Sequence, residues 1–243
     1  MLADDMPCNP RNIRPARVFQ DADQDVGDIY GTNVEVDYRG EDVTVENFIR
    51  VITGRHHADT PASRRLVTNS KSNVLVYLSG HGGDEFLKFQ DSEEVSSVDF
   101  ADSVEQMRIQ RRYNELLFMT DTCQAATLNN HFYSENVIAI GSSLKDENSY
   151  SHHSDAGLGV PIMDRFSYFT SKFIQKHRNQ PETRLASLFQ WFQDNYNQMY
   201  SHVGIRVDLF KSRPFKDVSI LDFFGSVKQA RLLSSARAIH FDT

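Results

Sequence analysis

Three short apolar runs divide the chain, and each predicts a buried strand. They span residues 74–78, 116–119 and 137–140. The first is continuously apolar and rich in β-branched and aromatic residues, which is typical of a strand covered on both faces. Between the first two runs, apolar residues recur at every third position from Val98 to Met107. This spacing predicts an amphipathic helix from Ser97 to about Tyr113.

Weaker patterns complete the expected elements. Thr44 and Gly54 are placed to begin and end a helix. Another helix is expected to start at or just after Cys123, and two more at about 164–177 and 184–200. The remaining expectations are a small hairpin at 86–89, short strands at 34–38, 205–207 and 218–221, and loops at 7–33, 55–72 and 142–161.

Apolar strands that alternate with helices predict an α/β fold with a mainly parallel sheet and helices on both faces. The 243 residues are enough for one such domain.

The net charge of −7 and the absence of a basic cluster argue against nucleic-acid binding. No run approaches the roughly 20 apolar residues of a membrane-spanning helix. No secretory signal is visible at the start of the chain. Residues 1–5 instead resemble the end of a buried strand that runs into a loop, so we expect the true N-terminus to lie upstream.

A histidine and a cysteine follow the first two strands. His81 lies between glycines shortly after residues 74–78. Cys123 lies shortly after the run 116–119. Ligands bind beyond the carboxyl ends of parallel strands, and a strand–helix–strand crossover usually places its two strands side by side. The imidazole can therefore face the thiol. A nearby imidazole and a helix N-terminus would both favour the thiolate.

This pair predicts a nucleophilic cysteine site. Cys123 would attack a carbonyl carbon, while His81 would act first as general acid and later as general base. The N–H groups of Gly82 and Cys123 are the expected oxyanion donors, and Gly82 and Gly83 leave room for a substrate carbonyl to approach the backbone. The alternative is a buried inert thiol and an unrelated loop histidine.

Several longer motifs resemble the catalytic subunits of GPI transamidases, which are legumain-like, caspase-fold cysteine peptidases. The matches extend from residue 1 to about 228. The motifs are Ala3-Asp4-Asp5-Met6, Cys8-Asn9-Pro10-Arg11-Asn12, Val34-Glu35-Val36-Asp37-Tyr38-Arg39, Ser79-Gly80-His81-Gly82-Gly83, Phe89-Gln90-Asp91-Ser92-Glu93-Glu94, Arg111-Arg112-Tyr113-Asn114-Glu115-Leu116, Asp121-Thr122-Cys123-Gln124-Ala125 and Asp222-Phe223-Phe224-Gly225-Ser226-Val227.

The resemblance implies a caspase-like three-layer sandwich. Residues 1–228 would form a single domain that is incomplete at its N-terminus, and residues 229–243 a C-terminal tail. The first strand and helix of the family's fold are expected to be missing. That strand carries an asparagine that supports the catalytic histidine in the family.

The implied reaction is a transamidation that needs no cofactor. Cys123 would attack the peptide bond before a C-terminal GPI-attachment signal and form a thioester, which the ethanolamine amine of the GPI glycolipid would resolve. The resemblance also implies a multisubunit complex at the endoplasmic reticulum membrane, with this domain on the lumenal side. Two other hypotheses remain: a legumain-type endopeptidase, and a non-catalytic chain that keeps only partner binding.

The resemblance also implies roles outside the dyad. Cys8 would form an intermolecular disulfide with a partner subunit, where the alternative is a free surface thiol. Glu35 and Asp37 would contribute to a structural calcium site, since both would project from one face of a strand and carboxylates suit a hard cation. A solvated strand face is the commoner interpretation of such a pair. The residues expected near the substrate pocket are Asp121, Ser149, Ser151 and Asp164.

Overall fold

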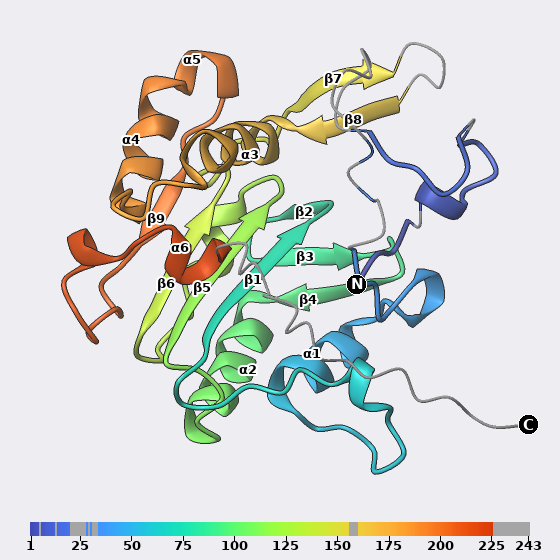
Figure 1. Cartoon of the computed structure of the whole chain (residues 1–243), viewed down its shortest axis with the longest axis vertical. Helices are drawn as coiled ribbons and strands as arrows, with labels where there is room; N and C mark the ends of the chain where they lie inside the picture. Colours follow the sequence, from blue (N-terminus) through green and yellow to red (C-terminus); the bar gives the residue numbers. More distant parts are fainter. Residues whose placement is uncertain are drawn as a thin grey trace, which may run out of the picture.

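A computed structural model describes residues 1–4, 6–12, 14–19, 28, 30, 34–155 and 160–225. The predicted tail at 229–243 lies outside these residues. The main sheet has the strand order β1 (Asn73–Ser79), β5 (Glu115–Asp121), β6 (Val137–Gly141) and β9 (Gly204–Arg206). The first three strands are parallel and β9 is antiparallel to β6 (Figure 1). The predicted mainly parallel sheet is therefore confirmed.

Helices cover both faces of this sheet, as predicted. Consecutive residues of β5 point to opposite sides: Leu116 and Phe118 join the core beneath α1 (Val45–Thr53) and α2 (Ser97–Ile109). Leu117 and Met119 join the core beneath α3 (Arg165–His177) and α4 (Leu185–Asp194). All four of these β5 side chains are fully buried, because β5 is an inner strand of the sheet.

The smaller elements lie around this frame. A three-stranded antiparallel sheet contains β2 (Gly82–Gly83), β3 (Phe86–Phe89) and β4 (Glu93–Ser96), which confirms the hairpin expected at 86–89. A separate hairpin pairs β7 (Ser151–Asp155) with β8 (Val160–Asp164). The other short helices are α5 (Tyr196–Met199), α6 (Leu221–Phe224) and the 3-10 turns Met6–Cys8, Gly40–Asp42, Ala62–Arg64, Ala125–Asn129 and Phe215–Asp217.

The first strand is less buried than predicted. Val74 and Val76 are buried on one face of β1, whereas Tyr77 is 40% exposed. Within the described sheet β1 pairs only with β5, so it forms an edge. A cavity of about 650 Å³ is lined by β1 together with residues of α1 and β3. A continuously apolar sequence therefore does not distinguish this edge strand from an inner one.

Two predicted strands and one predicted loop are wrong. Residues 34–38 form no strand, and only an isolated bridge joins Leu2 to Arg39 beside them. Residues 218–221 contribute a single bridge between Arg184 and Ser219 before α6 begins. The predicted loop 142–161 contains β7, whose polar residues show no apolar alternation because both strands of the hairpin lie outside the main sheet.

Some helix boundaries also differ from the prediction. The helix at 44–53 is confirmed: the Thr44 side chain accepts from Asn47 N, and Gly54 ends it with φ of 71°. The helix expected to reach Tyr113 ends at Ile109. The helix predicted for 184–200 is divided at Asn195, whose backbone leaves the helical region with φ of −105° and ψ of 11°.

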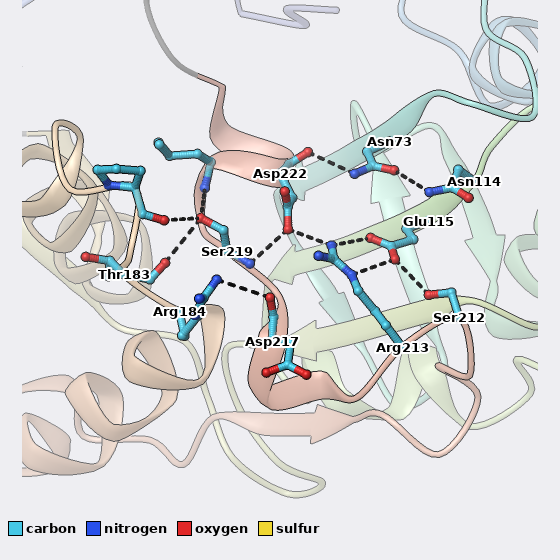
Figure 2. A network of polar contacts seen from close by, with 12 residues as sticks. Asn73, Asn114, Glu115, Thr183, Arg184, Ser212, Arg213, Asp217, Ser219 and Asp222 are labelled. Atoms are coloured by element: carbon cyan, nitrogen blue, oxygen red, sulfur yellow. Dashed lines mark hydrogen bonds and ion pairs between the residues drawn. The ribbon is translucent and has the colours of Figure 1, made fainter.

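The starts of β1 and β5 are held by a network of charged and polar side chains (Figure 2). Glu115, at the start of β5, is 3% exposed and accepts from Arg213 Nη2 at 2.7 Å and from Ser212 Oγ at 2.7 Å. Arg213 also pairs with Asp222 at 2.6 Å, and Asn73 on β1 donates to the Asp222 carbonyl at 3.3 Å. The segment 212–222 is therefore attached to the end of the sheet opposite His81 and Cys123.

Candidate active site

The register between β1 and β5 brings the histidine and the cysteine to the same edge of the sheet. Ser79 and Asp121 are the last paired residues, and Gly80 N donates to Asp121 O at 3.2 Å. His81 and Cys123 each lie two residues beyond this pair. The predicted shared edge is thus present, with His81 exposed and Cys123 half-buried.

His81 directly precedes the first strand of the small antiparallel sheet. Its carbonyl accepts from Lys88 N at 2.8 Å, and the next residues pair as Gly82 with Leu87 and Gly83 with Phe86. Hydrogen-bonded and non-hydrogen-bonded pairs alternate along an antiparallel ladder. Gly82 and Leu87 therefore form a non-hydrogen-bonded pair, which turns the Gly82 N–H away from β3.

Gly82 lies directly against the loop that carries the cysteine. A Cβ built on Gly82 would be 2.6 Å from Thr122 Oγ1 and 2.6 Å from Phe86 O. No side chain fits at this position without displacing a backbone carbonyl. The absence of a side chain at Gly82 is therefore required for close contact between the histidine hairpin and the cysteine loop.

Thr127 joins the same two segments through one buried hydroxyl group. Its Oγ1 accepts from Glu85 N, in the turn after β2, at 2.7 Å and donates to Gln124 O at 2.8 Å. Lys145 adds an exposed ion pair to Asp84 at 2.7 Å. These contacts fix the position of the hairpin relative to Cys123.

The helix predicted after Cys123 is present only as a short 3-10 helix, with Ala125 and Leu128 buried as expected. It is a five-residue 3-10 turn, Ala125–Asn129, preceded by Gln124 in the left-handed conformation with φ of 53°. Because macrodipoles require several aligned peptide groups, so short a turn gives little support to a thiolate. The stabilisation expected from a helix N-terminus is therefore not available to Cys123.

Asp121 is a fully buried carboxylate beneath this edge. It accepts from Ser149 Oγ at 2.8 Å, from Ser167 Oγ at 2.6 Å and N at 3.2 Å, and from Tyr77 OH at 3.4 Å. Hydroxyl and N–H donors thus replace the water that the carboxylate loses on burial. Burial and the Asp121 charge both raise the pKa of the Tyr77 hydroxyl.

Asp164 lies close to both Asp121 and His81. Burial, followed by the negative charge of Asp121, raises the Asp164 pKa to about 6, while nearby His81 opposes this shift. Ser151 is the register partner of Asp164 in the β7–β8 hairpin. A hydrogen bond thus links Ser149 to Asp121, strand pairing links Ser151 to Asp164, and the charge of Asp121 acts on Asp164.

Comparison with protein families matches residues 1–221 to the Peptidase C13 family. The chain belongs to the peptidase C13 family. It is 50% identical to the GPI-anchor transamidase of Saccharomyces cerevisiae over 94% of this chain and 54% of that protein. It is 46% identical to the GPI-anchor transamidase of Homo sapiens over 100% of this chain and 60% of that protein. This C13 chain thus spans little more than half the length of the curated relatives that it matches.

A structural neighbour was also found for this C13 chain. Caspase-1 of Spodoptera frugiperda matches with a TM-score of 0.46 and 12% sequence identity, over 77% of this chain and 73% of the caspase. At this TM-score the similarity is too weak to assign a shared fold. The α/β description therefore rests on the sheet and the helices that cover it.

Three further predicted residues of this C13 chain are Cys8, Glu35 and Asp37. Cys8 is an exposed free thiol in the turn Met6–Cys8. Glu35 is exposed and Asp37 half-buried in an irregular segment, so the strand on which their pairing depended is absent. Among the described residues, no group of three or more acidic, histidine or cysteine side chains is arranged to hold a metal ion. The calcium site stays a prediction.

Sequence reasoning missed Tyr77, Ser167 and the serine pair Ser142-Ser143. Tyr77 lay within an apolar run, and Ser167 within a helix, so neither had a distinguishing pattern. The serine pair directly follows β6 at the carboxyl edge, a position that could have suggested a role in the site. In the part of this C13 chain that the structure describes, no helix has the length and apolar character needed to cross a membrane.

Proposed function

We propose that this chain is the catalytic domain of a GPI-anchor transamidase. The observation that carries the proposal is the 50% identity to the yeast GPI-anchor transamidase over 94% of the chain. Identities of 46% to the human GPI-anchor transamidase and 48% to a putative GPI-anchor transamidase of Drosophila melanogaster support it. The shared carboxyl edge of His81 and Cys123 supplies the chemical groups that an acyl transfer requires.

In the proposed first step, the Cys123 sulfur attacks the carbonyl carbon at the attachment site of a proprotein. His81 takes up the thiol proton and then donates it to the leaving amine as the C–N bond breaks. The N–H groups of Gly82 and Cys123 stabilise the negative charge on the carbonyl oxygen. The products are a thioester on Cys123 and the released C-terminal signal peptide.

In the second step, an amine resolves the thioester. The ethanolamine nitrogen of the GPI glycolipid attacks the thioester carbon, and His81 accepts a proton from this nitrogen. The C–S bond breaks, the new amide is released, and the thiol is restored. We place the acyl group beside Asp121, Ser149, Ser151 and Asp164, because Ser149 bonds to Asp121 at the end of β5, Ser151 pairs with Asp164, and the charge of Asp121 acts on Asp164.

The proposed partners follow from the same function. They are the other transamidase subunits, the proprotein signal and the GPI glycolipid, on the lumenal side of the endoplasmic reticulum membrane. The exposed thiol of Cys8 is available for an intermolecular disulfide with one subunit. No cofactor is needed for the chemistry.

Product analysis tests this proposal. The full protein, purified with its partner subunits, is given a proprotein carrying a C-terminal signal and an excess of an amine acceptor. We expect an amide product that requires Cys123 and disappears in Cys123→Ala. Hydrolysis alone, in the presence of excess amine, would instead favour a legumain-type endopeptidase. Absence of any product would favour a chain that retains only partner binding.

A further inference from the structure

Among the residues that the structure describes, one backbone N–H group next to the nucleophile has no acceptor. Thr122 N donates to Ser142 Oγ at 3.2 Å, Gln124 N to Glu147 O at 2.9 Å, and Ala125 N to Ser143 Oγ at 3.1 Å. The next two N–H groups, of Ala126 and Thr127, also have acceptors. Within the described residues, only the N–H of Cys123 in this run lacks one.

Two buried hydroxyl groups fix the peptide that contains this N–H. Both Ser142 and Ser143 are fully buried. Ser142 Oγ donates to Thr122 O at 3.1 Å, and Ser143 Oγ donates to the same oxygen at 2.8 Å. Each hydroxyl thus accepts one backbone N–H of the cysteine loop and donates to one carbonyl.

The Thr122 carbonyl and the Cys123 N–H belong to the same peptide unit. Because that unit is planar and trans, its C=O and N–H point in opposite directions. Holding the oxygen with two donors therefore sets the direction of the N–H. The two donors also polarise the peptide, which strengthens the N–H as a donor to an anion.

We propose that Ser142 and Ser143 are positioning residues that aim the Cys123 N–H at the oxyanion of the reaction. They touch neither substrate nor reacting atoms and act through the Thr122–Cys123 peptide. The inference rests on the proposed acyl transfer at Cys123, but not on which amine resolves the thioester.

The serine pair is itself held in place. Ser142 N donates to Thr120 O at 3.0 Å, and Ser201 Oγ donates to Ser142 O at 3.0 Å. The preceding residue, Gly141, packs against the cysteine loop so closely that a Cβ there would lie 2.3 Å from Ala126 N. The end of β6 therefore serves as a fixed support for the cysteine loop.

Two probes of Cys123 separate this role from a general structural one. A peptide aldehyde with a small terminal side chain adds to the thiol: the C–S bond forms, the S–H bond breaks, and the former carbonyl oxygen takes the proton and occupies the oxyanion position. Iodoacetamide alkylates the same sulfur by displacement of iodide and needs no oxyanion donor. Variants Ser142→Ala and Ser143→Ala are compared with wild type in the purified complex.

We expect each variant to lose about 10-fold in aldehyde affinity, since removing an oxyanion donor outright costs roughly 100-fold or more. The alkylation rate should stay within about twofold of wild type if only the oxyanion donor is misaligned. The matched control is Ser134→Ala, because Ser134 is 1% exposed and bonds to Glu105 Oε2 at 2.8 Å far from the site. This control should leave both readouts unchanged.

The cysteine variants Ser142→Cys and Ser143→Cys change one side-chain atom and are weaker donors, and they replace any alanine variant that fails to fold. If the serine variants bind the aldehyde as tightly as wild type, the inference is wrong but the proposed acyl transfer is not. The same holds if the variants lose aldehyde affinity and alkylation rate equally. If wild-type protein is alkylated at Cys123 but does not bind the aldehyde, acyl transfer at this cysteine fails and the inference fails with it.

Discussion

Ser79 and Asp121 are the last register partners of β1 and β5, and the Asp121 carbonyl accepts from the residue after Ser79. This single pairing determines that His81 and Cys123 leave the sheet side by side. It also places the buried Asp121 carboxylate directly beneath them. The strand register therefore connects the sequence spacing of 42 residues to the geometry of the site.

Replacement of Gly82 should impair acyl transfer more than stability. In Gly82→Ala, the new methyl group would lie 2.6 Å from Phe86 O and from Thr122 Oγ1, so the hairpin or the cysteine loop must move. We expect a loss of about 100-fold in kcat/KM, comparable to loss of an oxyanion donor. Steady-state kinetics of the purified complex would measure it.

Gly80→Ala is the matched control for this substitution. A Cβ at Gly80 has its nearest neighbour, Lys88 O, at 3.7 Å, which is an ordinary van der Waals contact. Its kcat/KM should stay within about threefold of wild type, since no group of the proposed oxyanion site is displaced. Equal losses in the two variants would contradict the specific role of Gly82.

The raised pKa of Asp164 should make stability depend on pH. Between about pH 4 and 6 the folded protein binds the Asp164 proton and the unfolded chain releases it, so stability falls as the pH rises. Asp164→Asn removes this cost and should be more stable than wild type at pH 7.5, by about 1 kcal/mol after allowance for solvent screening.

This difference should disappear near pH 3, where Asp164 is protonated in both the folded and the unfolded state. Urea unfolding at pH 3 and at pH 7.5 would measure it. The control is Asp59→Asn, whose side chain is 90% exposed and which should follow wild type at both pH values. An Asp164→Asn variant that is less stable than wild type at pH 7.5 would contradict the prediction.

The network at the opposite end of the sheet should contribute strongly to stability. Removing Arg213 leaves the buried Glu115 carboxylate with Ser212 as its remaining side-chain donor (Figure 2). We expect Arg213→Ala to lower the free energy of unfolding by about 3 kcal/mol, as for a broken buried ion pair. Urea unfolding would measure the change.

An exposed ion pair provides the comparison. Arg50 pairs with Glu46 at 2.5 Å, with side chains 51% and 69% exposed, so Arg50→Ala should cost no more than about 1 kcal/mol. The double variant Glu115→Gln with Arg213→Ala should regain part of the loss, because it removes the unpaired charge. A double variant as unstable as the sum of its single variants would count against this explanation.

The sequence predicted the α/β class and the shared edge of His81 and Cys123, because runs such as 116–119 and the glycines around His81 are local signals. It did not predict that β1 is an edge strand of the described sheet or that β7 and β8 form a hairpin. Both depend on pairing between distant segments, which apolar periodicity does not report.

The site residues that escaped prediction share the same cause. Folding brings three separate segments together at this point. Ser142 and Ser143 bond to the carbonyl before Cys123, and Ser167 bonds to Asp121. The helix expected after Cys123 is short for a different reason. Gln124 adopts a left-handed conformation and Ser143 Oγ accepts the Ala125 N–H, so only a short 3-10 helix forms there.

The most direct test of the proposed dyad is the rate of amide formation by His81→Ala in the purified complex. Because His81 supplies both proton transfers of the proposed reaction, kcat/KM should fall by about 100-fold or more relative to wild type. His57→Ala, at a histidine 78% exposed, should keep the wild-type kcat/KM. An unchanged kcat/KM in His81→Ala would contradict the account.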